Sequence, residues 1–527
     1  MPYKIVVCDH IHAHGLDILK KSSEVDLIEV ADHPKDRLAE VLSGADVAIT
    51  RSSTDVDSAF LAAATGIKAI VRAGVGVDNV DIDACSRSGV VVMNVPTANT
   101  IAAVELTMAH LLNAVRNFPG ANHQLKNDRI WKREDWYGTE LKGKKLGIIG
   151  FGNIGSRVGL RAKAFEMEVI TYDPYIKPAK ATDLGVGYVT DFNAILECDI
   201  ITIHTPKNRE TINMINKEQI EKMKDGVILI NCARGGLYNE EALLEGLKSK
   251  KIRWAGVDVF NKEPAIQNPL LDVPNLYVTP HIGANTLESQ ERIAIEAAEA
   301  AIEAARGSSF PNALNLPIKE NELPSSLKPF LELIQKMGFL ATQINKNPIH
   351  SIQLTLEGEL RSYSAPLQTS LLVGALKASL GDAINYVNAP FVSEERGIKC
   401  KVDCKEAHGA YQNVVSIKLT SETETITLSG SVFDGSIQRI VEVNGFYLDI
   451  KPKGRMIFFR NTDVPGVIGA IGTILANHQI NIADFRLGRN AHNEALAVII
   501  VDDEVNQATL QELRNIKACL NIAYAVI

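Results

Sequence analysis

The chain has 527 residues and a formal net charge of −8, with 46% hydrophobic and 22% charged residues. At roughly 150 residues per domain, this length predicts three or four globular domains. The negative charge argues against a nucleic-acid partner, whose phosphates need a basic surface. The sequence contains no run of about 20 apolar residues, which is the length that a membrane-spanning helix needs. The start MPYKIVVCDH lacks the segments of a signal peptide, so we expect a cytoplasmic protein.

The seven cysteines are scattered and odd in number, which favours free thiols in a reducing compartment. Cys400 and Cys404 are near neighbours, but no second pair completes a zinc site. We therefore expect no bound metal.

The first 310 residues or so alternate Val/Ile-rich runs with longer helical patterns. The runs KIVVCD, ADVAIT, KAIVRAG and GVVVMNV are apolar enough for buried parallel strands, and residues 100–117 have helical periodicity. This alternation predicts βαβ units in a doubly wound sheet.

A second series of apolar runs begins at KKLGIIG and continues with EVITYD, CDIITIHT, GVILINCA, RWAGVDVF and LYVTPH. It predicts a second parallel sheet. Residues 286–307 form an Ala/Glu-rich helical pattern that Gly307 can end. We expect a helix near residues 101–116 to connect the two Rossmann-like modules, and the helix after residue 286 to return the chain to the first.

The proline-rich segment 311–329 predicts a linker. The alternating runs SIQLTLEGEL, VVSIKLT and TETITLSGSV then predict antiparallel strands of an α+β domain. From about residue 454 the order strand, helix, strand, strand, helix, strand predicts a small ferredoxin-like domain.

Three glycines, Gly150, Gly152 and Gly155, follow one strand and precede a helical run. In a dinucleotide fingerprint the first glycine permits a tight turn, the second lets the backbone approach a pyrophosphate, and the third lets helix and strand pack closely. The free N–H groups of the helix N-terminus attract the phosphates. A glycine turn without a ligand is the alternative.

Asp173 ends the next strand. A carboxylate there accepts hydrogen bonds from the ribose hydroxyls and repels a 2′-phosphate, which favours NAD over NADP. The alternative is a solvated aspartate at a strand end.

Arg234, Glu263 and His281 follow strands of the second module, at the edge where open α/β sheets bind ligands. Oxidation of a hydroxy acid needs a base for the hydroxyl proton, and His281 has a suitable pKa. Glu263 can orient the imidazole, and Arg234 can bind a carboxylate with its planar guanidinium. Each side chain alone could be structural, but the three together after a dinucleotide fingerprint favour catalysis.

The motifs VRAGVGVDNVD, HTP, NCARGG, DVF with EP, and PHIGA, together with the fingerprint, resemble the D-2-hydroxyacid dehydrogenase family. The resemblance implies that Arg234, Glu263 and His281 are the catalytic set. It also implies that Asp258 contacts the nicotinamide amide. Further NAD-lining positions implied in the same way are Asn153, Ile154, Thr205, Cys232 and Ala233.

The resemblance also divides the chain. A substrate domain would span 1–99 and 285–316, and an NAD domain 100–284. GALKASLGDAINYVNAPFVSEERGI resembles an intervening domain, expected over 317–453, and RNTDVPGVIGAIGTILANHQINIADFRLGR resembles an ACT domain, expected over 454–527. Long members of the family that oxidise 3-phosphoglycerate carry both additions.

A phosphorylated substrate needs extra cations, and the resemblance implies that Arg51 and Arg72 contact it, with Asn99 at the same cleft. Arg133 would reach the neighbouring subunit's site, or else be a solvated surface charge. The implied assembly is a homotetramer with dimers formed through the NAD domains.

In serine-inhibited bacterial relatives, the ACT positions matching Asn461, Asp463 and Asn481 bind L-serine across a subunit interface. Asn461 departs from the bulkier residue found there, so an ACT domain used only for assembly is the alternative. Two other functions stay open: a broad 2-hydroxyacid or 2-oxoacid dehydrogenase, and a non-enzymatic NAD-sensing binding protein.

Overall fold

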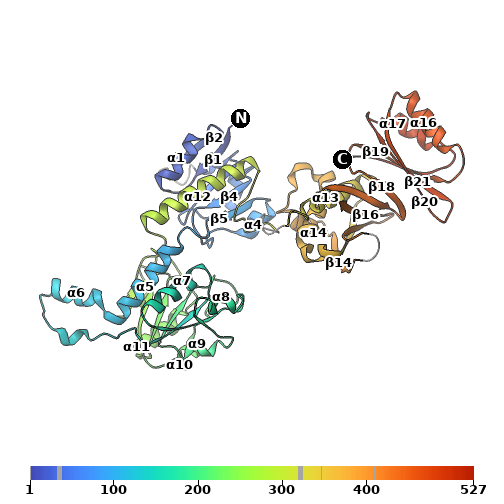
Figure 1. The fold of residues 1–527 in the computed structure, drawn as a ribbon. Coiled ribbons are helices and arrows are strands. Elements are labelled where there is room, and N and C mark those ends of the chain that lie inside the picture. Colours follow the sequence, from blue (N-terminus) through green and yellow to red (C-terminus); the bar gives the residue numbers. More distant parts are fainter. Residues whose placement is uncertain (1, 32–37, 318–323, 346, 408–410) are drawn as a thin grey trace.

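The computed structural model describes residues 2–31, 38–317, 324–345, 347–407 and 411–527. These residues form four β-sheets, each with helices packed against it, arranged along an elongated molecule (Figure 1). The four sheets match the predicted fold class of two Rossmann-like modules, an α+β module and a ferredoxin-like module. The domain boundaries inferred from the sequence stay predictions, and residues 318–323 of the predicted linker lie outside the described residues.

The first sheet is parallel, with the order β2-β1-β3-β4-β5. Its strands are β1 (Tyr3–Val7), β2 (Val25–Glu29), β3 (Val47–Thr50), β4 (Ala69–Arg72) and β5 (Val91–Asn94). The helices around it are α1 (Ala13–Lys21), α2 (Leu38–Leu42), α3 (Ser58–Ala63) and α4 (Ile82–Arg87). A Cβ on Gly15 would lie 2.5 Å from the carbonyl oxygen of Ala294, so α1 packs closely against the later helix that covers this sheet.

The second sheet is also parallel, with the order β12-β11-β10-β9-β6-β7-β8. Its strands are β6 (Lys145–Ile149), β7 (Glu168–Tyr172), β8 (Gly187–Tyr188), β9 (Ile200–Ile203), β10 (Val227–Asn231), β11 (Ile252–Val257) and β12 (Leu276–Val278). Its helices are α7 (Asn153–Ala164), α8 (Ala179–Thr182), α9 (Asn193–Leu196), α10 (Lys217–Lys222), α11 (Glu240–Lys248) and the 3-10 helix η3 (Pro269–Asp272). Both predicted parallel sheets are therefore confirmed, with β2 and β8 as strands that the sequence pattern did not reveal.

Two long helices carry the chain between these sheets (Figure 1). Helix α5 (Thr100–Arg116) leads to the second sheet, and α12 (Leu287–Arg306) returns to the first, which confirms the predicted helices. Thr286 caps the N-terminus of α12, and Gly307 ends it in a left-handed conformation with φ of 69°. Arg292 on α12 donates from Nη2 to the carbonyl of Ala98, just before α5, at 3.0 Å. This hydrogen bond connects the two segments that pass between the sheets.

An arm projects from the module of the second sheet and carries α6 (Phe118–Lys126) and the 3-10 helix η2 (Arg133–Trp136) (Figure 1). Trp131 is 78% exposed and Tyr137 is 82% exposed. Trp136 is held within the arm, because its Nε1 donates to Gln124 Oε1 at 2.7 Å. Exposed aromatic side chains on a projecting arm are typical of a surface that another protein chain covers.

The third sheet is mixed, with the order β14-β13-β15-β16-β17-β18. Its strands are β13 (Ile349–Glu357), β14 (Lys399–Lys405), β15 (Val414–Ser421), β16 (Thr425–Phe433), β17 (Ile437–Val443) and β18 (Phe446–Ile450). Its helices are α13 (Lys328–Ile344), α14 (Ser364–Leu380), α15 (Ala389–Glu395) and the 3-10 helices η5 (Gly358–Tyr363) and η6 (Gly381–Ala383). The predicted antiparallel strands are confirmed, but β14 pairs in parallel with β13 because it follows a helical crossover.

The fourth sheet is antiparallel, with the order β20-β21-β19-β22 that the ferredoxin-like prediction requires. Its elements are β19 (Arg455–Thr462), α16 (Val467–Asn477), β20 (Ile482–Arg489), β21 (Glu494–Val501), α17 (Gln507–Arg514) and β22 (Cys519–Val526). Met456, Phe458 and Val498 join the hydrophobic core of the third sheet. Gln343 on α13 also exchanges two hydrogen bonds with the backbone of Val526, at 2.9 and 3.0 Å. The last two modules therefore form one packed body.

This C-terminal body touches the first module through the loop before α15. Val387 is 3% exposed and packs into the core of the first sheet. Asn385 donates to the carbonyl of Gly89 at 2.8 Å, and Arg87 on α4 pairs with Glu395 at 3.1 Å. The contact is small but combines apolar, polar and ionic groups.

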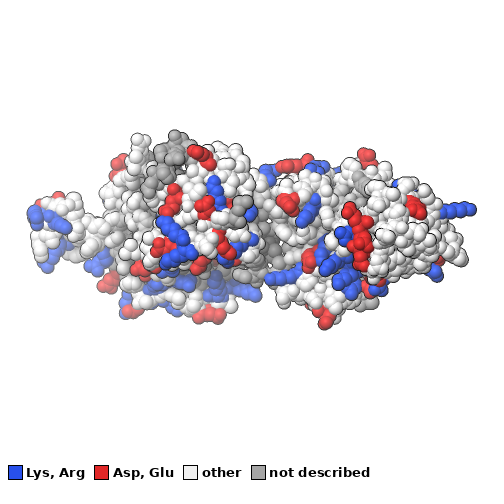
Figure 2. Space-filling view, turned by 90° about the horizontal axis from the view of Figure 1, so that it is seen from above, with Lys and Arg blue, Asp and Glu red and all other residues white. Residues whose placement is uncertain are grey.

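Acidic and basic side chains are interspersed over the face drawn in Figure 2. Among the described residues, no helix is both long enough and apolar enough to cross a membrane.

Replacing Gly374 with alanine should destabilise the C-terminal body, because a Cβ there would lie 2.0 Å from the carbonyl oxygen of Gln335 on α13. We expect hydrogen–deuterium exchange to show a loss of about 1–3 kcal/mol in the opening free energy of α13 and α14. Gly472→Ala is the matched control, since a Cβ there has no atom within 4 Å. Unchanged exchange in Gly374→Ala would contradict the packing described.

Candidate active site

A cavity of about 830 Å³ lies between the carboxyl ends of the strands of the first two sheets. Both modules contribute to its lining, as Arg51, Arg72, Asp78, Asn99, Arg234, Glu263 and His281 show. The sequence placed Arg234, Glu263 and His281 at one sheet edge. The structure brings them together with Arg51, Arg72 and Asn99 from the other side.

His281 and Glu263 form a hydrogen-bonded pair in this cleft, with Nδ1 of the imidazole 2.7 Å from Oε2 of the carboxylate. The other oxygen of Glu263 accepts the backbone N–H of Phe260 at 3.0 Å. The bond to Glu263 raises the pKa of His281, and burial opposes it. Burial acts to raise the pKa of Glu263, but the bonds from His281 and Phe260 outweigh it, so this pKa is lowered. The pair is therefore a carboxylate with an imidazole whose protonated form is stabilised.

The loop that carries His281 is held by the buried carboxylate of Asp258. Its oxygens accept the backbone N–H groups of Ile282 and Gly283, both at 2.8 Å, and the hydroxyl of Thr279 at 2.6 Å. His281 itself has φ of 53°, a left-handed conformation that few non-glycine residues adopt. With both of its oxygens engaged, Asp258 acts in this structure on the loop, and its contact with nicotinamide stays a prediction.

Three guanidinium groups converge on the cleft, from Arg51, Arg72 and Arg234. Burial lowers the pKa of Arg72 to about 10, and the positive charges of Arg51 and Arg234 lower it further. Burial also lowers the pKa of Arg51, against the effect of Asp9. Nε of Arg72 is buried without a hydrogen-bond partner among the described residues. Such a cluster favours an anionic ligand, because an anion would offset the repulsion and the burial cost.

Sequence reasoning missed three residues that hold these arginines. Asp78 pairs with Nε of Arg234 at 3.2 Å, across the cleft. The carboxylate of Asp9 accepts a hydrogen bond from the backbone N–H of Arg51. Oε1 of Gln290 accepts one from Nη2 of Arg51, at 2.8 Å. Asp9 lies two residues after β1, and Asp78 lies in the VRAGVGVDNVD motif, so polar residues after strands were the available signal. Gln290 lies on α12, and only the fold brings it here.

The fingerprint glycines have the geometry that a pyrophosphate needs. Gly150 has φ of 86°, and a Cβ on Gly155 would lie 2.1 Å from the carbonyl oxygen of Gly150. A Cβ on Gly152 would meet nothing within 4 Å, so the space beside this residue is open. No side-chain hydrogen bond caps the start of α7, and N–H groups left without such a cap at a helix N-terminus attract phosphates.

Among the other predicted cofactor positions, Asn153 and Ile154 begin α7, whereas Asp173, Thr205, Cys232 and Ala233 follow the strands β7, β9 and β10. Asp173 is partly exposed, and its carboxylate accepts the N–H groups of Phe151 and Tyr175 at 2.8 and 2.9 Å. The hydroxyl of Thr205 is buried without a partner among the described residues, as expected for a group that awaits a ligand. Cys232 is buried, and this burial raises the pKa of its thiol. These residues fit NAD.

Asn99 and Arg133 have different settings. Asn99 lies at the N-terminus of α5 and lines the cleft. Arg133 lies on the exposed arm in η2, away from the cleft of its own chain. A role for Arg133 in catalysis therefore requires a second subunit.

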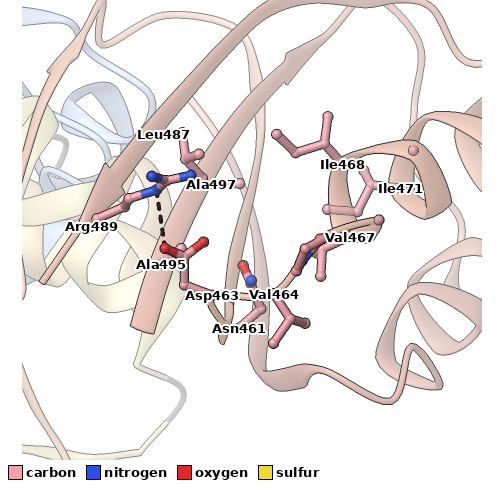
Figure 3. A pocket seen from close by; sticks show the side chains of 13 residues that line it. Asn461, Asp463, Val464, Val467, Ile468, Ile471, Leu487, Arg489, Ala495 and Ala497 are labelled. Carbon is pink, nitrogen blue, oxygen red and sulfur yellow. Dashed lines mark ion pairs between the residues drawn. The ribbon is translucent and has the colours of Figure 1, made fainter. Parts of the chain in front are cut away.

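A second cavity, of about 360 Å³, lies in the fourth module between β19, the start of α16 and the strands β20 and β21 (Figure 3). Asn461 and Asp463 both line it, and their binding of serine stays a prediction. Oδ1 of Asn461 is buried without a partner among the described residues, whereas Asp463 pairs with Arg489 at 3.1 Å. Asn481 does not line this cavity, and its Nδ2 donates to Asp502 at 2.6 Å. Within one chain only two of the three predicted serine-binding residues come together.

Three protein-family models match parts of the sequence. Residues 108–283 match the D-isomer specific 2-hydroxyacid dehydrogenase NAD binding domain. Residues 326–444 match the D-3-phosphoglycerate dehydrogenase intervening domain, and residues 455–518 match the ACT domain. Each match falls on one of the sheets described above.

Curated relatives match over almost the whole chain. The D-3-phosphoglycerate dehydrogenase of Bacillus subtilis is 37% identical, covering 99% of both chains, and that of Archaeoglobus fulgidus is 36% identical with the same coverage. Among solved structures, the TT0316 protein of Thermus thermophilus is 33% identical with a TM-score of 0.54, covering 59% of this chain and 99% of that one. An NAD-dependent formate dehydrogenase of Staphylococcus aureus in complex with NAD is 28% identical with a TM-score of 0.54, covering 59% and 98%.

Glu263→Gln should move the pH dependence of hydroxy-acid oxidation. If His281 is the base, as the sequence predicts, oxidation requires its neutral form, and the rate falls as pH drops through the pKa of His281. Glu263 raises this pKa, and its loss should shift the acid limb to lower pH, toward the ordinary value of about 6.5. The maximal rate should also fall about tenfold or more, because an amide does not stabilise the imidazolium.

The measurement is kcat/KM across the pH range for wild type, Glu263→Gln and Glu241→Gln. Glu241 is an exposed carboxylate on α11, so its replacement makes the same charge change outside the cleft. An acid limb that stays in place in Glu263→Gln would show that Glu263 does not set the pKa of the base.

Proposed function

The chain belongs to the D-3-phosphoglycerate dehydrogenases, and we propose that it oxidises D-3-phosphoglycerate to 3-phosphohydroxypyruvate with NAD, the entry step to serine. The observation that carries the proposal is the convergence of Arg51, Arg72 and Arg234 on a cleft that also holds the His281–Glu263 pair. A substrate whose only charged group is a carboxylate can be bound by a single arginine. A substrate with both a carboxylate and a phosphate accounts for three.

In the proposed arrangement Arg234 binds the substrate carboxylate, and Arg51 and Arg72 bind the phosphate. A planar guanidinium pairs with either group through two parallel hydrogen bonds. Asp78 orients Arg234 from the opposite wall, so both modules must be in place before the carboxylate is bound. Asn99 lies at the same cleft as a further polar contact.

His281 acts as the base. Because its Nδ1 proton is donated to Glu263, its Nε2 carries the free lone pair that takes the hydroxyl proton of the substrate. Glu263 stabilises the imidazolium that results. NAD, held by the fingerprint glycines, Asp173 and Thr205, accepts the hydride from the substrate carbon.

The subunit arrangement proposed is a homotetramer, with NAD-side dimers joined further through the C-terminal bodies. The exposed aromatic residues of the arm support a dimer contact there. Such a contact would carry Arg133 toward the partner's cleft. The cytoplasmic location stays a prediction.

The assay is NADH formation from D-3-phosphoglycerate, with D-glycerate as the matched substrate that lacks only the phosphate. We expect turnover of D-3-phosphoglycerate to exceed that of D-glycerate by at least about a hundredfold in kcat/KM, since the loss of one charge-assisted contact costs about 1.5–3 kcal/mol and two arginines are involved. His281→Ala should lower kcat by about 10²–10⁴-fold.

Other outcomes identify other functions. Equal use of D-glycerate would indicate a broad 2-hydroxyacid dehydrogenase. NAD binding without turnover of either compound would indicate an NAD-sensing binding protein, although the complete Arg234, Glu263 and His281 set gives that reading little support.

We propose in addition that the cavity at Asn461 and Asp463 binds L-serine as a feedback inhibitor, with Asn481 supplied by a second subunit. The unpartnered oxygen of Asn461 supports a polar ligand there. The Asp463–Arg489 pair offers one charge of each sign to the ammonium and carboxylate of an amino acid. Initial rates should fall at millimolar L-serine and stay constant with D-serine. Initial rates that change with neither L-serine nor D-serine would favour an ACT domain used only for assembly.

A further inference from the structure

A buried histidine lies behind the catalytic loop and has no part in the mechanism above. His110 is on α5 and is 3% exposed. Its Nε2 lies 3.0 Å from the hydroxyl of Thr279, at the end of β12. Burial lowers the pKa of His110 to about 4, so the ring is neutral at physiological pH.

The direction of this hydrogen bond follows from the number of protons available. The hydroxyl of Thr279 has one proton, and its 2.6 Å contact with the Asp258 carboxylate requires it to be donated there. The same oxygen can then only accept from His110, so Nε2 of His110 carries the ring proton. Nδ1 has no partner among the described residues, which suits a bare ring nitrogen better than a buried N–H.

The chain of bonds ends at the catalytic loop. Asp258 receives the proton of Thr279 and also holds the N–H groups of Ile282 and Gly283, the two residues after His281. The N–H of His281 donates to the Asp258 carbonyl at 2.9 Å. This network is what keeps the left-handed backbone of His281 in place.

The position of His110 is fixed from the other side by packing. A Cβ on Gly256 of β11 would lie 2.8 Å from Nδ1 of His110, so the ring lies directly against the strand that leads to Asp258. His110 therefore links the helix that joins the two modules to the loop that carries the base.

We propose that His110 is a positioning residue: its Nε2–H directs the Thr279 hydroxyl onto Asp258 and so holds His281 in register with Glu263 and the substrate. This inference rests on the proposed function of His281 as base. Since His110 lies outside the cleft lining, its loss changes how the bound substrate meets the base and not how tightly the substrate binds.

The test compares His110→Leu, which fills a similar volume without a donor, with His110→Gln, whose amide nitrogen can replace Nε2. We expect His110→Leu to lower kcat about tenfold to a hundredfold, because small displacements of a catalytic group have effects of this size. The KM for the hydroxy acid and the Kd for NADH, from fluorescence titration, should change less than about twofold. His110→Gln should recover most of kcat.

A second pair keeps the test independent of the folding of His110→Leu. Thr279→Val removes only the hydroxyl, whereas Thr279→Ser keeps it, so kcat should fall in the valine variant and persist in the serine variant. The proposal is overturned if His110→Leu keeps kcat within twofold of wild type. It is also overturned if His110→Leu and His110→Gln both show a lower kcat, a higher KM and weaker NADH binding to the same extent. The same holds if Thr279→Val and Thr279→Ser have the same kcat.

Failure of the proposed function would appear separately. If wild type prefers another 2-hydroxy acid over D-3-phosphoglycerate, the same variant-to-wild-type ratios are measured with that acid, and the role of His110 is decided by them. If wild type turns over no hydroxy acid, His281 is not a base and both proposals fail together.

Discussion

The two helices that cross between the first two sheets determine most of what this protein can do. Helix α5 leaves the first module and α12 re-enters it, so the carboxyl ends of two parallel sheets face one another across a single cleft. Open parallel sheets bind ligands at that edge, and two of them placed edge to edge can surround a small substrate. His281 and Glu263 come from the second module, and two of the three arginines, Arg51 and Arg72, come from the first. Neither module contains a complete site.

The same arrangement places the positively charged Arg51, Arg72 and Arg234 together in a partly buried cleft. Arg72 is partly deprived of solvent and lies near two other guanidinium groups, which is why its pKa is depressed. Asp9 and Asp78 offset part of the repulsion and leave the rest for an anionic substrate. The net charge of the chain is negative, so the positive charge of these arginines is local to the cleft.

The C-terminal half is a single body in packing terms, although its two parts match separate family descriptions. Residues of β19 and β21 complete the core beneath the third sheet, and α13 binds the last strand. The loop around Val387 then seats this body on the first module, beside α4. Packed elements therefore join the module that contains the ACT cavity to the first module.

The sequence by itself determined the local chemistry. Glycine spacing predicted the nucleotide turn, the order of apolar runs predicted the sheets, and Arg234, Glu263 and His281 could be selected because each follows a strand. These features depend on residues close together in the chain. The contacts between distant segments were decided only by the tertiary structure: Gln290 on Arg51, Asp78 on Arg234, and His110 behind Thr279. Such contacts leave no periodic trace in the sequence, because a buried histidine on an apolar helix looks the same whether it fills space or holds a catalytic loop.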